Sequence, residues 1–140
     1  MPLNNYEPIS DDTRALVVSA ENGRRHVGRN IGGCRITHYR VDGVILTNQK
    51  ACDYIVINEN KKTAYLIELK GCRIDKAAEQ LKATEETLSE YLRGYKLQFR
   101  IVCSKSRTTN VPLNSQRKII DKWKKEKRFR MSTNEINEVI

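Results

Sequence analysis

The residues best suited to chemistry are two acids and a lysine in the stretch CDYIVINENKKTAYLIELKG, residues 52–71. Two apolar, partly β-branched runs lie in this stretch, separated by the polar segment ENKK, and this pattern predicts a β-hairpin. Asp53 opens the first run, and Glu68 and Lys70 end the second. These three residues are therefore the candidate catalytic residues.

The position of the turn decides whether the three side chains share a face. With the turn centred on residues 60–61, Asp53 faces Glu68, and opposed residues of an antiparallel pair have Cβ atoms roughly 4.5–5.5 Å apart. Side chains alternate along a strand, so Lys70 shares the face of Glu68 while Leu69 points away. A slip of one residue would separate the charges, so the prediction depends on the register.

Two neighbouring carboxylates repel each other unless a positive group lies between them. A Mg²⁺ ion is such a group, because it binds one or two carboxylates together with waters and phosphate oxygens. A lysine nearby can hold water or stabilise negative charge, and the set suits metal-assisted hydrolysis of a phosphodiester. The simpler interpretation is an exposed ladder of solvated charges. The apolar runs that lead into both acids favour a buried hairpin instead.

This order of residues resembles the PD-(D/E)xK nuclease superfamily, which has the restriction-endonuclease-like fold. Its signature is an acid that opens one strand, followed on the next strand by Glu or Asp, any residue, and Lys, here Asp53, Glu68 and Lys70. The resemblance covers about residues 35–104. The amino-acid sequence there is also similar to that of small uncharacterised microbial members of the superfamily. Cys52 stands where the family name has proline, a position that is loose in the family.

The resemblance implies a set of roles for the site. Asp53 and Glu68 are expected to bind Mg²⁺, for which Mn²⁺ can substitute, with the Leu69 carbonyl as a further ligand. Lys70 is expected to position or activate water. Gln80, in the second turn of the following helix, can reach the metal or a phosphate, as glutamines there do in parts of the superfamily. A solvated glutamine is the equal alternative.

Family members often add an acid from an N-terminal helix, and Glu21 is the candidate here. The segment 13–20 is interpreted as a helix capped by the preceding polar residues, although its β-branched content and the turn signal at residues 22–23 are also consistent with a strand. Asp42 is a second candidate for an extra acid, and turn chemistry explains it equally well.

The elements after the hairpin predict an α/β fold. A strand is expected at residues 35–39, a helix that Asp75 caps and Gly94 ends, and a strand at residues 97–103. Strand, helix and strand with short links form a right-handed crossover and a parallel pair. The sheet is then mixed and flanked by helices, as in the restriction-endonuclease-like fold.

The length of 140 residues predicts a single domain over the whole chain. Residues 1–9 and 131–140 are expected to be loose arms, and a last helix is expected over residues 116–129. No internal repeat or linker divides the chain.

The formal net charge of +9 points to a polyanionic partner, nucleic acid before membrane. Among nucleic acids, DNA is expected before RNA. A Gly- and Arg-rich segment, residues 23–35, and the last helix concentrate the cations. A flexible basic loop and a solvated helix face are the alternatives to binding. The candidate nucleic-acid-binding residues are Arg24, Arg25, Arg29, Arg117, Lys118, Lys122 and Lys125.

The remaining features bear on location and assembly. No apolar run approaches the ~20 residues of a membrane span, and the N-terminus lacks a secretory pattern, so a cytoplasmic protein is expected. The four cysteines form no C-x-x-C pair, which argues for reduced thiols rather than zinc. Superfamily members are often dimers, so a homodimer is expected from the resemblance. The alternatives to a nuclease are an inactive nucleic-acid-binding module of the same fold, or an interaction subunit of a larger nucleic-acid-processing assembly.

Overall fold

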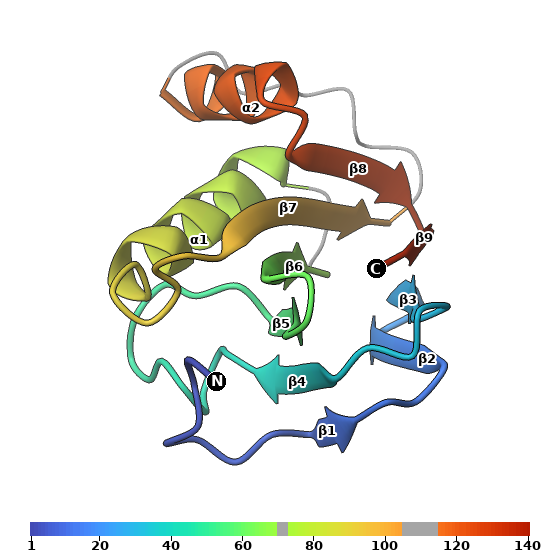
Figure 1. Cartoon of the computed structure of the whole chain (residues 1–140). Helices are drawn as coiled ribbons and strands as arrows, with labels where there is room; N and C mark the ends of the chain where they lie inside the picture. Colours follow the sequence, from blue (N-terminus) through green and yellow to red (C-terminus); the bar gives the residue numbers. More distant parts are fainter. Residues whose placement is uncertain (70–72, 105–114) are drawn as a thin grey trace.

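The chain forms a mixed α/β structure in which two β-sheets and two helices are arranged in layers (Figure 1). The computed structural model describes residues 1–69, 73–104 and 115–140. The larger sheet has the order β1-β4-β5-β6-β7-β8, and the smaller sheet has the order β2-β3-β9.

The larger sheet consists of β1 (Ser10–Asp12), β4 (Ile36–Arg40), β5 (Tyr54–Asn58), β6 (Thr63–Glu68), β7 (Lys96–Cys103) and β8 (Phe129–Thr133). The smaller sheet consists of β2 (Leu16–Glu21), β3 (Arg24–Arg29) and β9 (Glu135–Val139). The helices are α1 (Ile74–Thr87) and α2 (Ser115–Lys125).

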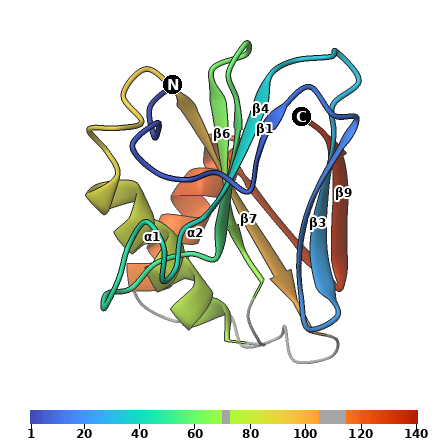
Figure 2. The ribbon, with the colours of Figure 1, turned by 90° about the horizontal axis from the view of Figure 1, so that it is seen from below.

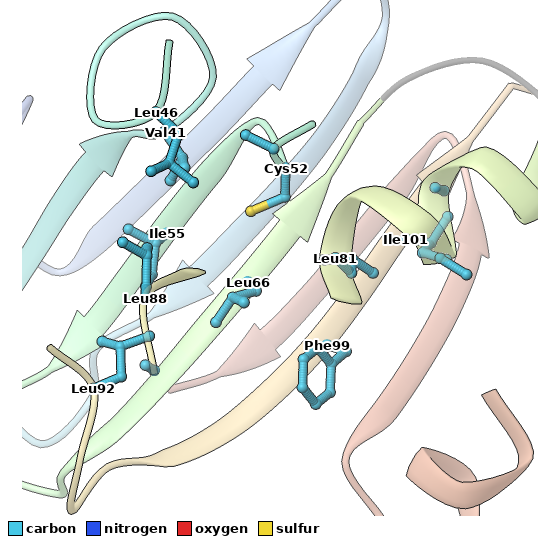
Figure 3. Packing of buried hydrophobic residues seen from close by; sticks show 14 of the residues in the cluster. Val41, Leu46, Cys52, Ile55, Leu66, Leu81, Leu88, Leu92, Phe99 and Ile101 are labelled. Atoms are coloured by element: carbon cyan, nitrogen blue, oxygen red, sulfur yellow. The ribbon is translucent and has the colours of Figure 1, made fainter. Parts of the chain in front are cut away.

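Both helices cover one face of the larger sheet, and the smaller sheet covers the other (Figure 2). The central strands are apolar on both faces because both faces are buried. Ile55 and Leu66 belong to the core under the helices, together with Leu81 of α1 (Figure 3). Val56 and Ile67, one position along each strand, belong to the core between the sheets.

The register predicted for the β5–β6 hairpin is confirmed. Asn58 pairs with Thr63, and the antiparallel ladder continues without a shift to Tyr54 and Ile67. Lys62 supplies the positive φ of +52° that the turn requires. The ends of both strands are therefore brought together as the sequence predicts.

The predicted parallel pair is also confirmed, since β6 and β7 run parallel across the connection through α1. Both ends of α1 differ from the prediction. The helix ends at Thr87, with Leu88 as its C-cap, and not at Gly94. Asp75 lies inside the first turn, where an acid is favourable at the positive end of the helix dipole. The N-cap position is Arg73, and no side chain caps the helix there.

The predicted helix over residues 13–20 is wrong. This segment contains β2, which forms an antiparallel hairpin with β3. Asn22 and Gly23 both have positive φ, +50° and +80°. Asn-Gly is a favoured pair for a two-residue hairpin turn whose backbone twist matches the strands. The β-branched residues and this turn together outweigh the capping signal.

The expectation of a basic loop at residues 23–35 is wrong for its first half, which is β3. The expected loose tail at residues 131–140 is wrong as well, because it forms the end of β8 and all of β9. Strand β9 lies parallel to β3, and Ile136 and Ile140 are buried between the sheets. The tail looked polar because only alternate residues of an outer strand face the core.

Residues 1–9 contain no described strand, but they are not a loose arm. Leu3 is fully buried in the core under the helices, and the Ile9 amide donates a hydrogen bond to the His38 carbonyl at 2.7 Å. These contacts fix the segment against the body of the protein.

Helix α2 is confirmed but ends earlier than predicted, at Lys125. Lys127 adopts a positive φ of +57°, which reverses the chain so that Phe129 can begin β8. Trp123 anchors the helix, because its ring stacks on Phe99 of β7 with a centroid distance of 3.9 Å. In the described part of the chain, no helix is long and apolar enough to cross a membrane.

Candidate functional site

The two candidate acids lie at the same end of the larger sheet, and both are fully buried. Asp53 precedes β5, and Glu68 ends β6. The antiparallel ladder stops at Tyr54, but Asp53 remains joined to β6. Its amide donates to the Ile67 carbonyl at 3.1 Å, and its Oδ2 accepts from the Leu69 amide at 2.8 Å. Asp53 is thus hydrogen-bonded to the residues on either side of Glu68.

Leu69 is held through both of its backbone groups. Its amide donates to Asp53, and its carbonyl accepts a hydrogen bond from Nε of Arg24. Its side chain is buried between the two sheets. Leu69 therefore points away from the face of the acids, as predicted, and its carbonyl already carries a cationic donor.

The predicted catalytic Lys70 lies outside the described residues. Within the described ranges, no three His, Cys, Asp or Glu side chains are grouped so that they could hold a metal ion. Among the described residues, Asp53 and Glu68 therefore form a pair and not part of a larger cluster of such side chains.

Cys52 and Thr84 connect the acid pair to α1. The Cys52 amide donates to Thr84 Oγ1 at 2.8 Å, and the same hydroxyl donates to the carbonyl of Gln80 at 2.8 Å. The predicted site residue Gln80 is half-buried. It lies one helical turn before Thr84, which is bonded to Cys52, the residue that precedes Asp53. Burial raises the pKa of the Cys52 thiol, and the charges of Glu68 and Asp53 act in the same direction.

Glu21 and Asp42, the candidate extra acids, are both linked to Arg40. Glu21 Oε1 lies 3.5 Å from Arg40 Nη2, and the Asp42 backbone carbonyl accepts from Arg40 Nε at 3.3 Å. Gly43, with φ of +82°, makes the turn after Asp42. Burial by itself would lower the pKa of Arg40, but Tyr54, Glu21 and Asp53 raise it, so this guanidinium stays charged.

The three arginines predicted to bind nucleic acid from residues 23–35 have different environments in β3. Arg24 is turned inward, where Nη1 donates to Ser104 Oγ at 2.6 Å in addition to the bond with Leu69. Arg25 pairs with Glu135 of the neighbouring strand. Arg29 is exposed. The flexible loop expected as the alternative does not exist at these positions.

The predicted basic face of α2 is exposed. This description fits Arg117, Lys118, Lys122 and Lys125. The helix begins near α1, since Gln116 Nε2 donates to Glu79 Oε1 at 2.9 Å. The basic face and the arginines of β3 come from elements on opposite faces of the larger sheet (Figure 2).

The sequence analysis missed the roles of four residues around the site. Ser104 and Thr84 contact the site through single hydroxyl groups from elements distant in sequence, and no local pattern marks them. Arg40 is the last residue of β4, opposite Tyr54, and could have been noticed as a cation at the same sheet end as Asp53. Arg24 directly follows the turn at residues 22–23, and this position in the sequence does not show whether its side chain points inward or outward.

The arrangement places two buried acids at one end of the larger sheet, with Arg24 bonded to the Leu69 carbonyl and Arg40 near enough to Asp53 for their charges to interact. Buried carboxylates are unfavourable without cationic or hydrogen-bonding partners. Comparisons of the chain with family models, with curated proteins and with solved structures gave no match.

Proposed function

We propose that this protein is a Mg²⁺-dependent nuclease of the PD-(D/E)xK type that hydrolyses phosphodiester bonds in nucleic acid, DNA before RNA. The observation that carries the proposal is the complete burial of Asp53 and Glu68 at the neighbouring ends of two paired strands, where Asp53 is hydrogen-bonded to Ile67 and Leu69. Buried acids are costly to keep, and costly groups cluster at functional sites.

The sheet and its helices support the restriction-endonuclease-like form of the proposal. The antiparallel hairpin, with Asp53 directly before β5 and Glu68 at the end of β6, precedes a helix and then a parallel strand. This is the order of elements that the superfamily core requires. The second sheet, β2-β3-β9, is an addition on the opposite face.

The donor set suits a hard divalent cation. Asp53 and Glu68 supply carboxylate oxygens, and Leu69 would add a backbone carbonyl, all of which are oxygen ligands of the kind that Mg²⁺ and Mn²⁺ prefer. When bound, the metal would acidify water and offset the charge of the phosphate.

The chain's own residues would divide the remaining work. Lys70 would hold the attacking water, and Gln80 would orient it or a phosphate oxygen from α1. Arg40, fixed by Glu21 and Tyr54, would keep the field at the sheet end positive. In this proposal Glu21 supports Arg40 instead of binding the metal directly.

The exposed cations would hold the nucleic-acid backbone. The basic face of α2 and Arg29 are accessible, and arginine and lysine contacts with phosphates supply most non-specific affinity. A homodimer would place two sites on two strands of a duplex.

A second candidate function is an inactive binding module of the same fold. The observation that favours it is the closed state of the acids, which are fully buried beside a carbonyl already bound by Arg24. In that case the acids and arginines would be a structural ion cluster, and nucleic acid would bind the exposed cations without being cut.

The deciding experiment is a cleavage assay on linear and supercoiled duplex DNA, single-stranded DNA, branched DNA and RNA, with Mg²⁺, Mn²⁺ or chelator. We expect Asp53→Asn, Glu68→Gln and Lys70→Ala each to lower the rate by about 100-fold or more, because each removes a group that acts on the reacting phosphate.

Glu90→Gln is the matched control. Glu90 is an exposed acid just after the C-terminal end of α1, whereas the candidate site lies near its N-terminal end. Folding of every variant is checked by circular dichroism. Full activity of all three site variants would contradict the site assignment. Binding without cleavage of any substrate would support the inactive module.

A further inference from the structure

Arg24 joins the smaller sheet to the end of β6, where both candidate acids lie. Its Nε donates to the Leu69 carbonyl, and its Nη1 donates to Ser104 Oγ at 2.6 Å. The Leu69 amide is bound to Asp53 Oδ2 at 2.8 Å. The guanidinium therefore binds the residue that follows Glu68 in the chain, and the backbone of that residue, Leu69, links it to Asp53.

The carbonyl that the proposed metal would use is thus already bonded to a cation. A hydrogen bond from a charged donor is stronger than one between neutral groups. It also draws electron density from the oxygen and places a positive charge beside it, and like charges within a few Å disfavour each other. A metal at the Leu69 carbonyl and Arg24 in its present position would each weaken the binding of the other.

We infer that Arg24 is a resident cation that competes with the divalent metal for the Leu69 carbonyl. It lowers the affinity of the site for metal, and it leaves Leu69 when metal binds. The inference rests on the proposed function for the identity of the metal ligands, and it adds a control on metal binding by a residue of the second sheet.

The burial of the site supports this competition. Asp53, Glu68 and Leu69 are all 0% exposed, so a cation reaches them only after a covering group moves. Arg24 is half-buried and is held at that end by two side-chain hydrogen bonds. Its backbone belongs to the β2–β3 hairpin, so the side chain can swing away while the sheet stays intact.

Arg25 offers a matched control on the same strand. It is adjacent in sequence and carries the same charge, but it pairs with Glu135 on the surface of the smaller sheet. Side chains alternate along a strand, so Arg25 points to the other face from Arg24. Loss of its charge changes the net charge of the protein equally without changing the contacts of Leu69.

The test measures Mn²⁺ binding to the full chain through the electron paramagnetic resonance signal of free Mn²⁺. We expect Arg24→Gln to bind Mn²⁺ roughly 5- to 20-fold more tightly than the wild type, since it removes one nearby positive charge. Arg25→Gln should stay within about twofold of the wild type, because exposed charges are well screened. Ser104→Ala, which frees one anchor of Arg24, should tighten binding about twofold to threefold.

Unchanged or weaker Mn²⁺ binding by Arg24→Gln would overturn the inference. If that variant does not fold, Ser104→Ala decides by the same criterion. The tighter Mn²⁺ binding must also disappear in the double variant Arg24→Gln/Asp53→Asn. Tighter binding that persists in the double variant would overturn the inference as well.

Failure of the proposed function has a different signature. If Asp53→Asn and Glu68→Gln bind Mn²⁺ as tightly as the wild type, the acids are not the metal site, and both ideas fail. If those variants lose Mn²⁺ binding while Arg24→Gln gains nothing, the metal site stands and only the competition fails.

Discussion

Glu138 of β9 shows what a single buried acid requires in this protein. Its Oε2 lies 2.7 Å from His26 Nε2 and accepts from Arg100 Nε at 2.7 Å, and its Oε1 accepts from Arg100 Nη2 at 3.0 Å. Arg100 also lies over the ring of Tyr65. Burial by itself raises the pKa of Glu138, but the bonds from His26 and Arg100 lower it to about 2.

The lowered pKa of Glu138 predicts a pH-dependent contribution to stability. A carboxyl whose folded pKa is depressed stabilises the fold above its unfolded pKa of about 4.5 and loses this contribution as the pH falls towards 2. We expect Glu138→Gln to lower the free energy of unfolding by about 2–3 kcal/mol at pH 7. Urea unfolding at pH 7, 4.5 and 3 should show the difference shrinking with acid.

Glu135→Gln is the control for that measurement, because Glu135 is also in β9 but pairs with Arg25 at the surface. Its effect should stay below about 0.5 kcal/mol. A loss for Glu138→Gln as small as that of the control would contradict the role assigned to the buried bonds.

His38 of β4 also makes stability depend on pH, but it is a base, whereas Glu138 is an acid. The ring is buried, with Nε2 2.8 Å from Ser19 Oγ. Burial, with the nearby charges of His26 and Arg14, lowers the pKa of His38 from 6.5 to about 4. A base with a depressed pKa binds its proton more readily when unfolded, so stability falls as the pH drops from 6.5 towards 4.

The prediction for His38 is a stability loss on the order of 2 kcal/mol between pH 7 and pH 4.5. In His38→Gln the stability should be lower at pH 7, but its decline across this window should be smaller by about that amount. Chemical denaturation at closely spaced pH values measures both slopes. Equal slopes for the two proteins would contradict a neutral, buried His38.

At the scale of elements, β9 is an edge strand of the smaller sheet, and the end of the chain that follows it contacts the larger sheet. It pairs with β3 in parallel register, and Lys61 Nζ donates to the backbone carbonyl of Ile140 at 3.1 Å. Ile136 is fully buried between the sheets, while Val139 is 41% exposed. The last strand is therefore part of the core, with one face in the interior and one in solvent.

This placement predicts unequal costs for two apolar truncations in the same strand. Ile136→Ala should lower the free energy of unfolding by about 2–5 kcal/mol, because it leaves a cavity between the sheets. Val139→Ala should change it by less than about 1 kcal/mol. Thermal and urea unfolding of both variants measure the difference. Similar, small effects would indicate that β9 is frayed, as a polar tail would be.

At the scale of the whole molecule, excess positive charge is spread over separate elements. The net charge is +9, and the exposed face of α2 carries a dense group of cations. Binding of nucleic acid releases counterions in proportion to the phosphates contacted, so the dependence of affinity on salt counts these contacts. The salt slope therefore tests whether α2 binds a phosphate backbone.

We expect replacement of the four α2 cations by Gln to reduce the slope of log affinity against log salt by about 3 to 4 on duplex DNA. The replaced residues are Arg117, Lys118, Lys122 and Lys125. Fluorescence anisotropy between low and moderate salt measures the slope.

The control removes four other exposed cations, so both variants lose the same charge. Its replaced residues are Arg14, Lys62, Arg93 and Lys96. A slope that changes equally in the two variants would show that only the net charge matters and that α2 has no special contact with nucleic acid.

The sequence by itself determined the elements that depend on local chemistry. The hairpin of Asp53 and Glu68 has the predicted register, because the short polar turn between two apolar runs fixes which residues face each other. Helix α1 and the parallel strand after it follow from hydrophobic periodicity and a short connection. These features require no knowledge of distant contacts.

The tertiary structure alone decided the parts that depend on distant partners. Strand β9 contains Glu135, Asn137 and Glu138 and gave no strong strand signal, and it becomes a strand because β3 supplies a hydrogen-bonding edge. Arg24 was predicted to bind nucleic acid, but in the folded chain it donates a hydrogen bond to the Leu69 carbonyl. Hydrogen bonds between residues far apart in sequence leave no periodic pattern, so only the folded chain shows which residues surround the acids.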